Sequence, residues 1–366
     1  MAPPPAKLDE FVPHPVKEQF PGIDFCITSP PPWPEAIVLG FQHFLVMLGT
    51  TVLIPTILVP QMGGGDEEKA RVIQTLLFVA GINTFLQGFF GTRLPAVIGG
   101  SFTYLLPTIS IILSRRFIFI IDPYVRFVHT MRAIQGALIA ASSFQIIVGF
   151  FGIWRIVIRF LSPLAAVPIV TLAALGLFYI GFPNLARCVE VGLPALVLLI
   201  FFSQVMNISQ LIALNDCHST GTLIAVSRFA SATPVPPAIF SRGIGWQGIG
   251  ILLDGMFGTA NGSAASVENA GLLGLTRVGS RRVIHIAACF MLFFSILGKF
   301  GALLASIPLP IVAALYCILF AYAGSLRTKF ILGFSLFMGL SVPEYFKEYE
   351  ILAGYGPVHT RSRANC

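Results

Sequence analysis

Charged side chains are unusually scarce in this sequence. Asp, Glu, Lys and Arg make up 11% of its 366 residues, whereas soluble domains carry roughly 25%. A water-soluble protein of this length needs more charge to cover its surface, so the composition excludes an ordinary cytosolic or secreted protein. The hydrophobic share of 55% and the mean hydropathy of +0.84 also exclude a disordered chain. We therefore expect the chain to lie in a lipid bilayer.

Motifs that would indicate other functions are missing as well. The six cysteines form no Cys-x-x-Cys pair and have no regular spacing, so they predict neither a disulfide framework nor a zinc site. No His-Glu-x-x-His metal motif and no Gly-x-Ser-x-Gly turn occurs, so we expect no enzymatic reaction and no metal or organic cofactor. The net charge of +7 is distributed in short basic runs between apolar segments, which argues against a nucleic-acid partner.

Long apolar stretches supply most of the remaining sequence. A helix that crosses a bilayer needs about 20 predominantly apolar residues. Charge-free stretches of that length occupy 36–65, 72–92, 94–114, 133–154, 160–186, 191–215 and 300–326. Shorter or interrupted ones occupy 217–253, 255–276, 283–298 and 330–343. Together they predict an all-α polytopic membrane protein with about ten to twelve spans.

Two of these stretches are interrupted in the same way. Residues 94–114 contain Gly99-Gly100 and Pro107, and residues 258–277 begin with the small and polar run GTANGSAAS before a short apolar helix. Irregular backbone at membrane depth persists only where it is buried in protein or lines a cavity. A matched pair of broken segments, one in each half, indicates the binding site of a transporter. The alternative is that both are kinked spans without a function.

Glu268 and Asn269 lie where the second broken segment is expected to enter its half-helix. A carboxylate at membrane depth is a functional candidate by default. The positive end of a helix can hold it in the charged form. A carboxylate beside an amide also suits a flat heterocycle with ring N–H donors. The structural alternative is that Glu268 only caps the half-helix.

Three further polar sites interrupt apolar sequence. Gln42 and His43 lie in the first span, about 100° apart around a helix, and favour a network between packed helices over direct substrate contact. In the first broken segment, Ser101 precedes Phe102, whose ring could stack on an aromatic substrate or serve only in packing. His218 belongs to the run Asp216–Thr220, which could relay protons or form a plain turn.

The blocks GFQHFLVMLGTT, TRLPAVIGGSFTY and ASVENAGLLGLTRVGSRRV resemble the nucleobase–ascorbate transporters (nucleobase:cation symporter family 2) of the plant type. The family signature is Gln, Glu or Pro, then Asn-x-Gly, four residues, and Thr-Arg or Thr-Lys. Here it is met by Glu268, Asn269, Gly271, Thr276 and Arg277. The resemblance covers nearly all of the chain from about residue 31 to 357.

The resemblance implies fourteen spans in two inverted repeats of seven, divided into a core and a gate domain, with an elevator motion of the core. It implies the plasma membrane as location and a homodimer formed through the gate domain. The expected stretches are a Pro-rich cytosolic tail (1–35), the core (36–154 and 208–306), the partial gate (155–207 and 307–345) and a C-terminal tail (346–366).

The resemblance also assigns roles to residues. Glu268 would bind the substrate, the backbone of Val267 and Phe102 would add hydrogen bonds, and Phe102 would stack. Asn269, Gly271, Thr276 and Arg277, together with Gln42 and His43, would shape the site. Glutamate at the first motif position favours a nucleobase such as xanthine, uric acid, adenine or uracil over ascorbate. Proton coupling through Glu268 is expected, with Na⁺ as the alternative ion.

The chain departs from the family in its length. Between Ser203 and Ser219 it omits what would be the seventh span and the loop after it, and the fourteenth span is also missing. His218 stands where the family carries a second substrate-binding glutamate, so His218 is itself a candidate binding residue. The alternative function is therefore a truncated member that does not transport and that is inactive or associates with full-length partners.

Overall fold

The computed structural model describes residues 23–25, 27, 30–156, 182–186, 189–205, 218–232, 235–307, 311 and 338–345. Much of the two stretches expected to form the gate domain, 155–207 and 307–345, lies outside the described residues. So do most of the N-terminal tail and all of residues 346–366. The expected core stretches, 36–154 and 208–306, are described over most of their length.

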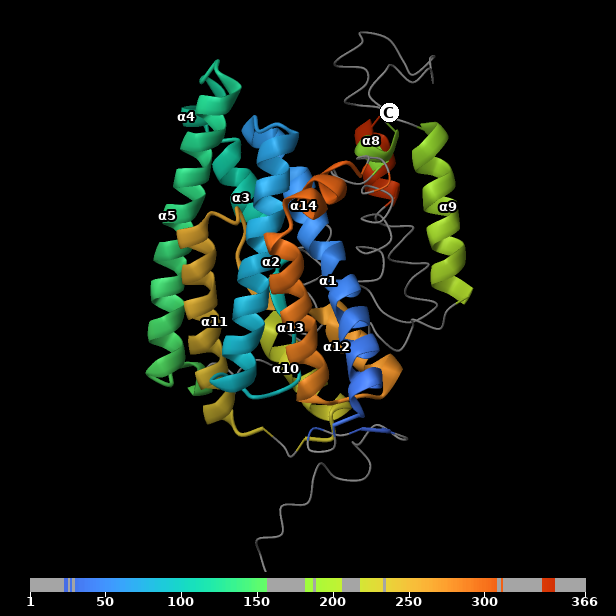
Figure 1. The fold of residues 1–366 in the computed structure, drawn as a ribbon. Coiled ribbons are helices and arrows are strands. Elements are labelled where there is room, and N and C mark those ends of the chain that lie inside the picture. Colours follow the sequence, from blue (N-terminus) through green and yellow to red (C-terminus); the bar gives the residue numbers. More distant parts are fainter. Residues whose placement is uncertain are drawn as a thin grey trace, which may run out of the picture.

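The described helices and strands form two groups with the same order of elements (Figure 1). In each group two helices are followed by a three-residue strand, a short helix and further helices. The first group comprises α1 (Trp33–Met62), α2 (Asp66–Phe89), β1 (Ile98–Gly100), the 3-10 turn η1 (Phe102–Tyr104), α3 (Leu105–Ile112), α4 (Arg115–Ile118) and α5 (Pro123–Phe150). The second comprises α10 (His218–Phe229), α11 (Pro237–Phe257), β2 (Ser263–Ala265), α12 (Val267–Thr276), α13 (Arg281–Ile296) and α14 (Gly298–Ala305). Between them lie α8 (Phe182–Leu185) and α9 (Val189–Val205).

The strands of the two groups pair with each other. β1 and β2 form an antiparallel two-stranded sheet in which Ile98 lies opposite Ala265 and Gly100 lies opposite Ser263. Each broken segment predicted from the sequence is thus a short strand followed by a short helix. The pairing satisfies backbone groups that would otherwise have no partner at membrane depth.

Helices of the two groups also pack across the molecule. The most extensive contacts join α5 to α11 and α2 to α13, and β1 lies against α2 as β2 lies against α11. The α5–α11 contact is close enough for the Ser241 hydroxyl to donate to the carbonyl oxygen of Gly149 at 2.7 Å. Small residues at such interfaces let two backbones approach closely.

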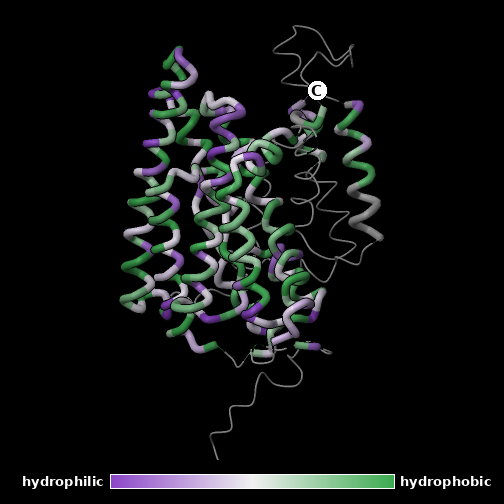
Figure 2. Tube along the Cα trace, in the orientation of Figure 1, coloured by the Kyte–Doolittle hydropathy of each residue, from purple (hydrophilic) through white to green (hydrophobic). Residues whose placement is uncertain are grey.

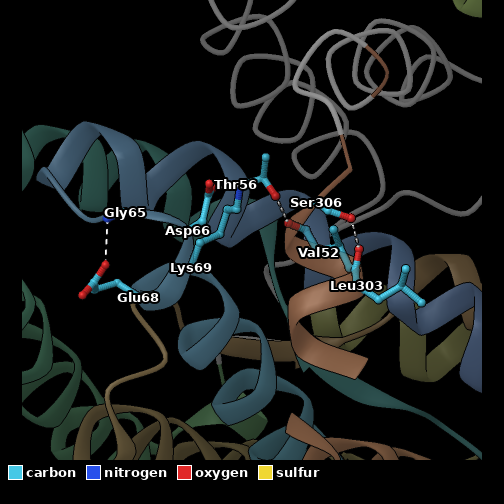
Figure 3. A network of polar contacts seen from close by, with 8 residues as sticks. All are labelled: Val52, Thr56, Gly65, Asp66, Glu68, Lys69, Leu303 and Ser306. Carbon is cyan, nitrogen blue, oxygen red and sulfur yellow. Dashed lines mark hydrogen bonds and ion pairs between the residues drawn. The ribbon is translucent and has the colours of Figure 1, made fainter. Parts of the chain in front are cut away.

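The turn between α1 and α2 shows how the sequence ends one helix and begins the next (Figure 3). Gly63 ends α1 in the left-handed conformation with φ of 94°, which glycine adopts without strain. At the start of α2 the carboxylate of Glu68 accepts the Gly65 N–H at 2.8 Å, and Lys69 pairs with Asp66 at 2.7 Å. Acidic residues in the first turn of α2 complement its helix dipole.

Three described helices, α1, α2 and α5, are long and apolar enough to cross a membrane. α13 and α14 would make a fourth span together, although the chain bends by 90° between them. The stretch predicted at 217–253 consists of two helices, α10 and α11. Several other predicted stretches lie partly or largely outside the described residues, so the total of about ten to twelve spans remains a prediction.

Large apolar side chains are exposed on the outside of the described helices, and Figure 2 shows many hydrophobic residues (green) along them. Phe144 on α5 is 70% exposed, and Ile296 at the end of α13 is 76% exposed. Inside, phenylalanines pack against one another, with the rings of Phe44 and Phe294 stacked at 4.9 Å. Large apolar side chains on the outside together with a packed interior are typical of a protein surrounded by lipid.

The close contact between α5 and α11 leads to a prediction about adding one methyl group at Gly149. A Cβ atom added at Gly149 would lie 2.2 Å from the backbone nitrogen of Gly245, whereas one added at Gly136 on the same helix meets nothing within 4 Å. We expect Gly149→Ala to lower the free energy of unfolding by about 1–3 kcal/mol because the two helices must separate. Gly136→Ala should leave it unchanged or slightly higher. Thermal unfolding of the purified variants in detergent measures both, and equal melting temperatures would contradict the close contact.

Candidate functional site

The paired strands place the starts of two short helices on either side of one small sheet. Ser101, which follows β1, donates its N–H to Gly262 at 3.1 Å, and Ser266, which follows β2, donates its N–H to Val97 at 2.9 Å. η1 therefore begins beside one end of the sheet and α12 beside the other. Gly99 in β1 lies close to α1, because a Cβ atom on it would overlap the methyl carbon of Met47, whose side chain would have to move.

A serine caps each of these helix starts. The hydroxyl of Ser101 accepts the N–H of Thr103 at 3.4 Å, and the hydroxyl of Ser266 accepts the N–H of Asn269 at 3.2 Å. Serine is favoured there because its oxygen satisfies an N–H that has no partner within the helix. The remaining N–H groups give each helix start a partial positive charge.

Glu268 lies in the first turn of α12, where the sequence predicts it. Its side chain is half-buried, and its Oε2 atom accepts a hydrogen bond from the Ser266 hydroxyl at 2.9 Å. The helix cap is Ser266 itself, so Glu268 is not needed to cap α12. The carboxylate is held at a positive helix end while part of it stays accessible to a ligand.

Asn269 joins this helix start to α1. Its side-chain oxygen lies 3.0 Å from Nδ1 of His43, and its amide nitrogen donates to the Ser266 hydroxyl at 3.1 Å. Asn269 and His43 are both buried. Gln42, by contrast, is exposed. The two side chains therefore lie on different faces of α1, and only His43 faces the bundle interior.

The other motif residues follow α12 away from Glu268. Val267 is half-buried at the first position of the helix, and Gly271 is buried in its middle. The Thr276 hydroxyl donates to the carbonyl of Leu272 at 2.9 Å, near the end of the helix. Arg277 ends α12 in the left-handed conformation with φ of 57° and is exposed. The second part of the motif therefore shapes the end of the helix and lies apart from Glu268.

The two remaining candidates belong to elements that adjoin the strand pair. Phe102 begins η1 directly after Ser101 and packs, half-buried, against the main apolar core. His218 is the first residue of α10, which packs against α12 and β2. The next residue, Ser219, accepts the N–H of Ala265 through its hydroxyl at 3.4 Å. The position of the His218 side chain lies outside what the structure describes.

A second carboxylate at membrane depth, Asp254, is a candidate that we did not select from the sequence. It is completely buried in α11, and its Oδ1 atom accepts from the Thr259 hydroxyl at 3.4 Å. Neither of the two ion pairs among the described residues includes it. The sequence contained a signal that could have identified it, since Asp254 is the only charged residue between Arg242 and Glu268.

Asp254 is connected to the strand pair by a chain of buried polar groups. The Thr259 hydroxyl also contacts the carbonyl of Asn261 at 2.7 Å, and the Asn261 amide donates to the carbonyl of Ser101 at 3.1 Å. On the other side of β2, Asn83 donates to the Ser263 hydroxyl at 3.1 Å. Within the described part of the chain, no group of three or more His, Cys, Asp or Glu residues could hold a metal ion.

Comparison with known proteins agrees with this arrangement. A family model described as Permease family matches residues 34–217 and 202–348. Nucleobase-ascorbate transporter 7 of Arabidopsis thaliana is 53% identical over 98% of this chain and 84% of its own length. Nucleobase-ascorbate transporter LPE1 of Zea mays is 53% identical over 99% of this chain and 86% of its own length. The chain belongs to the nucleobase–ascorbate transporter family. It is therefore a membrane transporter and not an enzyme.

This member of the nucleobase–ascorbate transporters is shorter than its relatives. The alignment with the Arabidopsis transporter runs over 453 residues, which exceeds the 366 residues of the chain, so the relative carries internal residues that this chain lacks. The two ranges matched by the family model overlap at 202–217, in the region of the predicted gap. Most of that region lies outside the described residues.

The His43–Asn269 contact leads to a prediction with a neighbouring control. Replacing His43 with Ala leaves the buried Asn269 oxygen without its partner, so we expect the free energy of unfolding to fall by about 1–3 kcal/mol. Gln42→Ala, one residue away on the exposed side of α1, should change it by less than about 0.5 kcal/mol. Thermal unfolding in detergent compares the two variants. A larger loss for Gln42→Ala would show that the contact does not stabilise the protein.

Proposed function

We propose that this protein carries one nucleobase at a time across the plasma membrane, in symport with a proton. The observation that supports this most is Glu268, a half-buried carboxylate at the start of a half-length helix that is paired, through its strand, with a second broken segment. Transporters place substrate sites at such broken helices near the middle of the bilayer. The names of the relatives, nucleobase–ascorbate transporters, agree with this substrate class.

The chemistry of the site suits a flat heterocycle. The Glu268 carboxylate can accept hydrogen bonds from two ring N–H groups, which xanthine, uric acid and uracil offer and ascorbate lacks. Backbone N–H groups at Val267 and Phe102 lie in the first turns of two helices and can donate to ring carbonyls. The Phe102 ring supplies an apolar face for stacking. Ser101 fixes the backbone at which Phe102 begins its turn.

Proton coupling requires a group that binds a proton on one side of the membrane and releases it on the other. Glu268 meets this requirement because it lies at membrane depth and is only half-buried. Asp254 is fully enclosed and is connected to the backbone of Ser101 through Thr259 and Asn261, which makes it a positioning residue in this proposal. Na⁺ is the alternative ion.

The arrangement of the two groups of elements supports the finer fold proposal. Two helices, a strand, a half-helix and a further helix recur in the same order, and the two strands meet antiparallel. This is the pattern of an inverted repeat. The described helices within 36–154 and 208–306 would form the core domain, which moves as an elevator against a gate domain and carries the bound base with it. A homodimer formed through the gate domain completes the proposal.

The alternative of a non-transporting member rests on the internal gap and on His218. The comparisons do not favour it, because the matches run through both halves of the chain at about 50% identity. The observed strand pair and the His43–Asn269 contact also require both halves to be folded together. We therefore propose transport, with an affinity limited by His218.

Uptake should depend on Glu268. In a host that lacks its own nucleobase uptake, we expect accumulation of radiolabelled xanthine or uracil that increases as the external pH falls. Glu268→Gln keeps the shape but removes the charge and the proton, so uptake should fall to background. Glu67→Gln, on the exposed start of α2, is the matched control and should transport normally. Correctly localised protein with no pH-dependent uptake would contradict the proposal.

His218 provides the opposite test, a gain of affinity. A neutral imidazole cannot replace a carboxylate that accepts two N–H bonds, and the lost interaction corresponds to about 1–3 kcal/mol. His218→Glu should therefore lower the KM for the base by about tenfold to a hundredfold. His129→Glu, at an exposed position on α5, should not change it. If the two substitutions alter KM equally, then His218 does not contact the substrate.

A further inference from the structure

One end of the described molecule is strongly basic. It is the end at which α1, α11 and α13 begin and at which α2, α5, α10 and α12 finish (Figure 1). Arginines lie at or beside these helix ends at positions 93, 155, 228, 242, 277, 281 and 282. In the described part of this end, the only acidic residues are at positions 24 and 35. Because Lys and Arg accumulate on the cytoplasmic side of membrane proteins, this end faces the cytoplasm in our proposal.

A cavity of about 630 Å³ opens at this end, between the starts of α1 and α13. Its polar lining consists of Ser280, Arg281, Arg282 and His285. Trp33 and Ile286 are among its apolar walls. Among the described residues that line the cavity there is no carboxylate, so this part of the lining has a positive charge.

Arg282 and His285 are held by contacts with neighbouring residues. The Arg282 guanidinium donates to the carbonyl of Pro31 at 3.2 Å and lies over the Trp33 ring, 4.7 Å from its centre. Neither Arg281 nor Arg282 takes part in the two ion pairs found among the described residues. His285 stacks on Phe89 with ring centres 4.5 Å apart, and its buried Nε2 atom has no hydrogen-bond partner in the described structure.

Apolar strips lead from the cavity along both helices toward the middle of the membrane. On α13 the exposed side chains are Cys289, Phe293 and Ile296, at spacings that keep them on one face. On α1 the exposed side chains Trp33, Ile37 and Phe41 form one row, each four residues after the last. Glu35, Val38, Gln42 and Leu45 are exposed beside this row. The helices are adjacent, since the rings of Phe41 and Phe290 meet at 5.3 Å. A basic cavity joined to apolar strips matches a molecule with an anionic head and long tails.

We propose that this cavity binds the phosphate headgroup of an anionic phospholipid of the cytoplasmic leaflet, with the acyl chains lying along α1 and α13. Basic pockets between spanning helices on the cytoplasmic side are suited to such headgroups. Arg281 and Ser280 lie at the phosphate, and His285 packs behind them with its Nε2 atom against Gly88 of α2. The Arg282–Trp33 pair forms the wall at the membrane interface. The bound lipid fastens the start of α1 to the start of α13. This site is independent of the nucleobase site and does not rest on transport.

The full-length protein purified in detergent provides the test. Phosphatidylglycerol should raise its melting temperature in a saturable way, and native mass spectrometry should show a bound lipid. Phosphatidylcholine with the same acyl chains should have a clearly smaller effect, and inorganic phosphate should have none. Arg281→Gln should weaken phosphatidylglycerol binding about fivefold, and Cys289→Trp, which fills the cavity without a change of charge, should weaken it as well.

The chain offers a matched control in Arg115, which begins α4 outside the cavity and is followed by a second arginine, as Arg281 is. Arg115→Gln should bind phosphatidylglycerol as the unmodified protein does. An equal loss in Arg115→Gln would show non-specific attraction to basic residues and would overturn the proposal. Equal shifts with phosphatidylcholine, or with inorganic phosphate alone, would overturn it too, because the site would then recognise acyl chains or a free anion.

Discussion

The backbone pairing of β1 with β2 is the interaction on which the rest of this structure depends. Neither broken segment can lie in a membrane alone, because its unpaired N–H and C=O groups would each cost several kcal/mol in lipid. Each strand provides hydrogen-bond partners for the backbone groups of the other. The neighbouring Ser101 and Ser266 extend this row of backbone hydrogen bonds to Gly262 and Val97. The two halves of the chain must therefore fold around one another, and the central site exists only when they do.

From this pairing follow the direction and the chemistry of both helix starts. Each strand ends beside the start of a short helix, and a helix start carries N–H groups without partners inside the helix and a partial positive charge. Ser101 caps the start of one helix, and Ser266 caps the start of the other. Asn269 then ties the second start to His43 of α1. A site that favours acceptor groups and a carboxylate thus arises from backbone geometry before any ligand is present.

Those features of the structure that depend on local sequence patterns could be predicted from the sequence alone. Glycine pairs and small polar residues inside apolar stretches predicted the two broken segments, and α12 begins at Val267, next to the predicted Glu268. The partner of each segment was not predictable, because strand register and the His43–Asn269 contact join residues far apart in the chain. The sequence also suggested that Gln42 could face the interior with His43. Only the packing of α1 against its neighbours decides which of the two does so.

The two carboxylates at membrane depth differ in ways that separate their roles. Asp254 is fully enclosed, so a ligand can reach it only if helices move apart, and its contacts run through Thr259 and Asn261 to the backbone of Ser101. Glu268 is half-buried, at a helix start that stabilises negative charge, with one hydrogen bond to Ser266. In the proposed mechanism the carboxylate must meet substrate and exchange a proton, which requires access, and Glu268 is the more accessible of the two. In our proposal Asp254 is a positioning residue, whose contacts lead through Thr259 and Asn261 to Ser101.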